Sequence, residues 1–99
     1  SDLELAAQRE VTEAYDGFET ARAEFGLALE GRTVAIESYR VQEVRYRSGA
    51  TTVLELLQAQ DDISQAEATL VQSRFTARLA RARLEAILGT RFHPSGGPS

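Results

Sequence analysis

Apolar residues recur at heptad spacing along two long segments of the chain, with polar residues between them. In the first segment a series of mostly large side chains runs every seven residues (Val11, Phe18, Phe25, Arg32, Tyr39, Tyr46), and a series of mostly small ones lies three positions later (Ala7, Ala14, Ala21, Ala28, Ala35, Gln42). A heptad repeat is typical of a left-handed coiled coil, and alanine in one series lets helices approach closely. We therefore predict a helix over residues 3–47.

The second segment repeats this scheme over residues 53–88. Its two series are Leu56, Ile63, Leu70, Ala77, Leu84 and Ala59, Ala66, Ser73, Ala80, Ile87. Both segments also carry apolar residues outside these series, such as Leu27 and Val34 in the first and Phe75 and Leu79 in the second. Two apolar faces on one helix indicate contact with more than one neighbour.

The two predicted helices are joined by a short turn over residues 48–52. Gly49 suits the left-handed position that ends a helix, and Thr52 followed by Glu55 has the spacing of a capping box. The sequence thus predicts an all-α fold, a long antiparallel two-helix coiled-coil hairpin over residues 1–89. After Leu88 we expect Gly89 to end the second helix and residues 90–99 to form a disordered tail.

Charge favours the antiparallel pairing of these helices. Each one begins with acidic residues and ends with arginines, which complements its own macrodipole. Folding back at Gly49 then sets acidic residues of one helix beside basic residues of the other. We expect, for example, Arg45 near Glu55 and Glu19 near Arg81.

Composition limits the possible functions. A chain of 99 residues forms at most one domain, and its net charge of −4 with a pI near 5.0 gives no support to nucleic-acid binding. There is no cysteine, and all 11 basic residues are arginine. The chain has no signal-peptide pattern and no apolar run near the 18 residues or so that a membrane helix needs, so we expect no membrane-spanning helix.

Candidate catalytic residues are few. His93 stands next to Pro94 in the expected tail, and the adjacent Asp61 and Asp62 point about 100° apart on a helix, with no third ligand type nearby. There is no nucleophile–base pair and no glycine-rich phosphate loop. We predict a protein that is not an enzyme and that has no cofactor and no metal site.

Residues 39–89 resemble the last helical hairpin of the TolC family, the outer-membrane efflux and type I secretion channels. The resemblance lies in Arg45-Tyr46-x-x-Gly49, then Leu54, Leu56-Leu57 and Ala59-Gln60, and finally an alanine-rich helix ending Ala86-Ile87-Leu88-Gly89. The upstream helix fits the family in character. The resemblance implies a homotrimeric channel in the outer membrane of a Gram-negative bacterium, with this hairpin in the wall of its periplasmic α-helical tunnel.

The resemblance also implies partners and a docking site. Hairpin tips of the family meet a periplasmic adaptor protein, which links the channel to an inner-membrane pump in a tripartite assembly. By position, the docking tip consists of Arg47, Ser48, Gly49, Ala50, Thr51 and Thr52. Tyr46, Glu55 and Gln58 are candidates for the pore entrance, where the family often has two acidic residues; Glu55 matches the first, but Gln58 replaces the second.

The resemblance further implies that the chain is a C-terminal piece of such a channel, without the β-barrel through which the channel meets the membrane. Two other functions stay open. The chain is alternatively the hairpin of the adaptor itself, although the Leu-Leu-x-Ala-Gln run favours the channel. It is otherwise a self-associating coiled-coil module, with a dimer as the first expectation. The sequence does not distinguish a drug, a metal ion or a protein as the exported substrate.

Overall fold

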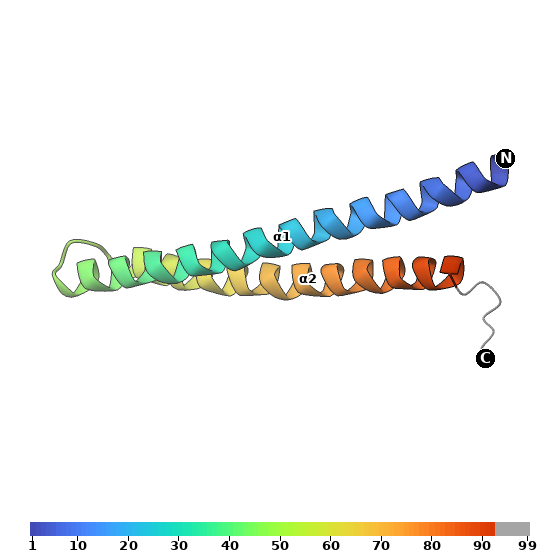
Figure 1. Ribbon diagram of the computed structural model, residues 1–99. Coiled ribbons are helices and arrows are strands. Elements are labelled where there is room, and N and C mark those ends of the chain that lie inside the picture. Colours follow the sequence, from blue (N-terminus) through green and yellow to red (C-terminus); the bar gives the residue numbers. More distant parts are fainter. Residues whose placement is uncertain (93–99) are drawn as a thin grey trace.

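The chain folds as a hairpin of two long helices. The computed structural model describes residues 1–92, in which α1 comprises Asp2–Arg47 and α2 comprises Val53–Phe92, antiparallel to each other (Figure 1). The hairpin is about 70 Å long, with the turn at one end and the start of α1 and the end of α2 at the other. This confirms the predicted all-α hairpin. Of the predicted tail, residues 90–92 belong to α2, and residues 93–99 lie outside the described residues.

The seam between the helices follows the predicted heptads. The six apolar residues that are buried within residues 1–90 all belong to the four series named above: Ala14, Ala21, Ala28, Ala59, Leu70 and Leu84. Burying each of the two leucines contributes about 2 kcal/mol. The alanines contribute mainly by allowing close approach of the helix axes, since their side chains bury little area.

The helix ends are capped by local contacts. The Ser1 side chain accepts a hydrogen bond from the Glu4 backbone N–H at 3.3 Å, which caps the start of α1. Acidic residues lie in the first turn of α1 and arginines in its last turn, in the arrangement that the helix dipole favours.

The end of α2 differs from the prediction. Gly89 does not end the helix, which continues to Phe92. A glycine inside a helix costs only about 1 kcal/mol relative to alanine, so it ends a helix only where the chain turns into the left-handed region. In the described part of the chain Gly49 alone has a positive φ, and the Thr90 hydroxyl donates to the Ala86 carbonyl at 2.9 Å within the continuing helix.

Neither of the two cross-helix neighbours expected from charge, Arg45 with Glu55 and Glu19 with Arg81, forms an ion pair among the described side chains. Glu19 pairs with Arg22 of its own helix at 3.2 Å, and this hydrogen bond raises the pKa of Arg22. Arg81 pairs with Glu85 at 3.1 Å, again within one helix. Within residues 1–90, whose side chains the structure describes, a single ion pair joins the helices, between Arg32 Nε and Glu67 Oε2 at 3.6 Å. Residues three or four positions apart on one helix are always close together. An exposed charged side chain therefore pairs more readily with such a neighbour than with a residue of the other helix.

The hairpin is not uniformly closed. Toward its N-terminus α1 departs from α2, so the two helices lie close near the turn and apart at the opposite end (Figure 1). Leu3 and Leu5 of this departing part are exposed. The first turns of α1 therefore receive almost no packing from α2.

Candidate functional site

The predicted docking tip begins with a Schellman motif, a compact hydrogen-bonded end of α1. Gly49 has φ +81°, and its N–H donates to the Tyr46 carbonyl at 3.1 Å. The Ala50 N–H reaches back to the Arg45 carbonyl at 2.7 Å. These two bonds are the pair that defines the motif. The left-handed role predicted for Gly49 is thus observed, and the conformation of the turn is fixed by its own backbone.

The second half of the tip starts α2. The Thr52 hydroxyl accepts from the Glu55 backbone N–H at 3.2 Å, as the predicted capping box requires. The Glu55 carboxylate does not complete that box. It accepts a hydrogen bond from the Thr51 hydroxyl instead, so both threonines of the tip are tied to Glu55.

Arginines and Ser48 brace the end of α1. Arg45 Nη2 donates to the Ala50 carbonyl at 3.3 Å, and Arg47 pairs with Glu43 at 3.5 Å. The Ser48 hydroxyl donates to the Arg45 carbonyl at 3.0 Å. These side chains contact their own end of α1, and Glu55 of α2 holds the other half of the tip.

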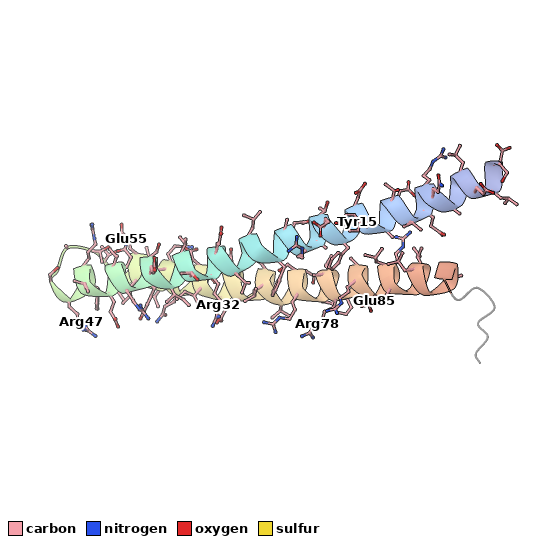
Figure 2. The ribbon with its side chains drawn as sticks, in the orientation of Figure 1. Tyr15, Arg32, Arg47, Glu55, Arg78 and Glu85 are labelled. Carbon is pink, nitrogen blue, oxygen red and sulfur yellow. The ribbon has the colours of Figure 1, made fainter. Side chains whose placement is uncertain are left out.

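The structure brings together two of the three pore-entrance candidates. Glu55 and Gln58 line one shallow hollow of about 310 Å³ on the side of α2, and the Gln58 side chain donates to Asp62 at 3.1 Å. Among the described residues no hydrogen bond joins Tyr46 to either of them. Glu55 and Arg47 point to opposite sides of the tip (Figure 2), so the candidate entrance residues and the basic end of α1 present different surfaces.

Sequence reasoning missed an apolar feature of the tip. Val44, Val53 and Leu54 flank the turn and are 65%, 52% and 74% exposed. A signal was available, because none of the three belongs to a heptad series that packs in the seam. The tip thus combines a rigid polar turn with apolar side chains that nothing in the hairpin covers.

Within residues 1–92 no group of three or more potential ligands lies close enough to hold a metal ion. In the same range neither helix contains a stretch apolar enough to cross a membrane.

The comparisons with known proteins give the family. The model of the outer membrane efflux protein family matches residues 2–90, nearly the whole length of both helices. The searches of curated proteins and of solved structures found no match. Since the family model covers far more than half of the chain, the chain belongs to the outer membrane efflux protein family, which is a family of transport proteins and not of enzymes.

Proposed function

We propose that the hairpin is a segment of the periplasmic tunnel wall of an outer-membrane efflux or secretion channel, and that its tip docks on a periplasmic adaptor protein. The single observation that carries the proposal is the family match over both helices. The same match favours the channel over the adaptor as the source of the hairpin. Two features of the structure support the finer parts of the proposal.

The first feature is the apolar surface that the hairpin leaves exposed. On α2, exposed large apolar residues lie at heptad positions away from the seam (Leu54, Leu57, Val71, Phe75, Leu79). On α1 a similar set lies away from the seam (Val34, Val41, Val44). A helix in a tunnel wall has a neighbour on each side. The seam supplies one neighbour, and these residues are available for the next hairpin.

The amount of exposed surface agrees with this assignment. The chain exposes 7429 Å². A compact monomer of its mass, 10.9 kDa, exposes about 5600 Å². The excess, roughly 1800 Å², exceeds the share of about 800 Å² that each partner contributes to one standard interface. The elongated shape of the hairpin produces this excess, and the area is large enough for contacts on two sides, as in a tunnel wall.

The second feature is the tip. It projects beyond the seam at the end of the hairpin, and its backbone conformation is fixed by the bonds around Gly49. A preformed turn binds a partner without the entropic cost of ordering a loop. Val44, Val53 and Leu54 offer apolar contact beside it.

The test uses the channel that contains this chain. Gly49→Pro removes the N–H that bonds to Tyr46 and is incompatible with φ +81°. Ala50→Trp leaves the turn intact but fills the space a partner tip would occupy. Both variants should abolish efflux or secretion while the channel stays in the outer membrane, whereas Ala50→Ser at the same position and Glu30→Gln on an exposed helix face should transport normally. Normal transport by Gly49→Pro and Ala50→Trp would contradict the docking role.

A further inference from the structure

The two sides of the seam differ in side-chain size. In the middle of the hairpin the seam is flanked on one side by mostly small residues (Gly17, Glu24, Gly31, Thr69, Thr76) and on the other by large ones (Tyr15, Arg22, Leu29, Glu67, Arg74). Toward the open end the first side continues to Arg83 and the second to Arg81. Each set recurs at seven-residue spacing, so each keeps to one side along the supercoil. In cross-section the hairpin therefore resembles a wedge. We call the side with Gly17, Gly31 and Thr69 the narrow side and the side with Tyr15 and Arg74 the wide side.

The side-chain contacts between the helices differ between the two sides of this wedge. Three contacts bridge the seam on the wide side: Arg32 with Glu67 at 3.6 Å, the Gln60 amide donating to the Tyr39 hydroxyl at 3.3 Å, and Arg74 over the Phe25 ring at 5.9 Å. On the narrow side a groove of about 760 Å³ runs between the helices instead. Its floor is formed by residues such as Ala21, Ala28 and Ala66.

This groove continues toward the open end of the hairpin. A second hollow of about 370 Å³ shares Ala21, Glu24 and Thr76 with the first and extends it to Gly17 and Arg83. Around these positions a Cβ added to Gly17 or Gly31 would meet no atom within 4 Å. The two glycines are therefore not required for packing inside the hairpin. Because they have no side chain, they leave the surface of the narrow side free of protruding groups.

We infer that the narrow, grooved side faces the lumen of the tunnel and the wide, arginine-bridged side faces outward. This inference rests on the proposed function. In a closed ring of helices the outer perimeter is longer than the inner one, so neighbouring helices leave more room for side chains on the outside. Large residues fill that room, while glycine, alanine and threonine suit the crowded inner side.

The tip agrees with this orientation. Glu55 precedes Thr69 by two heptads, and Gln58 precedes Gln72 by two heptads, so both candidate entrance residues lie on the grooved side. Thr69, Gln72, Thr76 and Glu24 then form the polar surface that solutes pass farther along the tunnel.

Cysteine substitution tests the orientation. The chain contains no cysteine. Thr69→Cys lies on the grooved side, and Ser64→Cys, also exposed and on the same helix, lies on the wide side. In the channel reconstituted in planar bilayers, with any cysteine elsewhere removed, a charged methanethiosulfonate reagent should lower the single-channel conductance stepwise for Thr69→Cys and leave it unchanged for Ser64→Cys. Mass spectrometry establishes that both are labelled.

The opposite pattern, or an unchanged conductance of labelled Thr69→Cys, would overturn the orientation while the pore itself, and with it the proposed function, stands. Absence of any pore would count against the proposed function instead. A second measurement is independent of labelling. Glu24→Gln on the grooved side should shift the reversal potential in a salt gradient toward lower cation preference, and Glu67→Gln on the wide side should not. A larger shift for Glu67→Gln would equally overturn the assignment.

Discussion

Replacing Gly49 by alanine should destabilise the hairpin by about 1 kcal/mol, although the new methyl group touches nothing. A Cβ at this position would meet no atom within 4 Å, so the whole cost arises from the backbone, which has φ +81°. The left-handed conformation costs an L-residue roughly 1–2 kcal/mol. Alanine also restricts the unfolded chain, which offsets about 0.4–1 kcal/mol.

The matched control is the same substitution at Gly26. This glycine lies inside α1, and a Cβ there would also meet no atom within 4 Å. Alanine is favoured over glycine in a helix interior by about 1 kcal/mol, so Gly26→Ala should stabilise the hairpin. One chemical change thus has opposite signs at two open sites, because only the backbone conformation differs.

Urea unfolding followed by far-ultraviolet circular dichroism measures both effects. With a slope of about 1–3 kcal/mol per molar urea, the two midpoints should move by roughly 0.3–1 M in opposite directions. All proteins must be compared at one concentration, since self-association would otherwise add to the apparent stability. A Gly49→Ala midpoint equal to or above that of the wild type would refute the reasoning.

Four further outcomes are expected. Far-ultraviolet circular dichroism of the isolated chain should give more than about 80% helix, and measurable strand content would contradict the fold. Sedimentation should show self-association, with a dimer first, because exposed apolar residues such as Phe75 and Leu79 gain about 25 cal/mol per Å² on burial; a monomer up to millimolar concentration would argue against it. Ala21→Leu should overpack the seam and cost about 1–3 kcal/mol in urea unfolding, whereas Ala23→Leu on the exposed face should be nearly neutral. Glu67→Gln should cost less than about 1 kcal/mol, and high salt should reduce the difference, because both partners of its pair with Arg32 are largely exposed.

The sequence predicted what depends on periodicity and on backbone stereochemistry. The heptads located the buried Ala14, Leu70 and Leu84, and the need for a positive φ located the turn at Gly49. Prediction from the sequence failed where two local conformations or two side-chain pairings have nearly the same free energy. Gly89 can either end a helix or continue it for about 1 kcal/mol, and Glu19 can reach either Arg22 or a residue of α2. The exposed apolar residues at the tip were missed because a heptad analysis concentrates on the seam.

The turn at Gly49 also bears on the order in which the hairpin forms. Residues that face each other across the seam are close in sequence at the tip and far apart at the other end: Tyr39 and Gln60 are 21 positions apart, and the first turns of α1 contact almost nothing. The entropy lost on closing a loop grows with its length, so pairing is least costly next to the turn. We expect the transition state for folding to contain the turn and its flanking helical turns, with the remainder closing afterwards like a zipper. Changes at Gly49 should then slow folding, while changes at Ala14 or Leu84 should mainly accelerate unfolding.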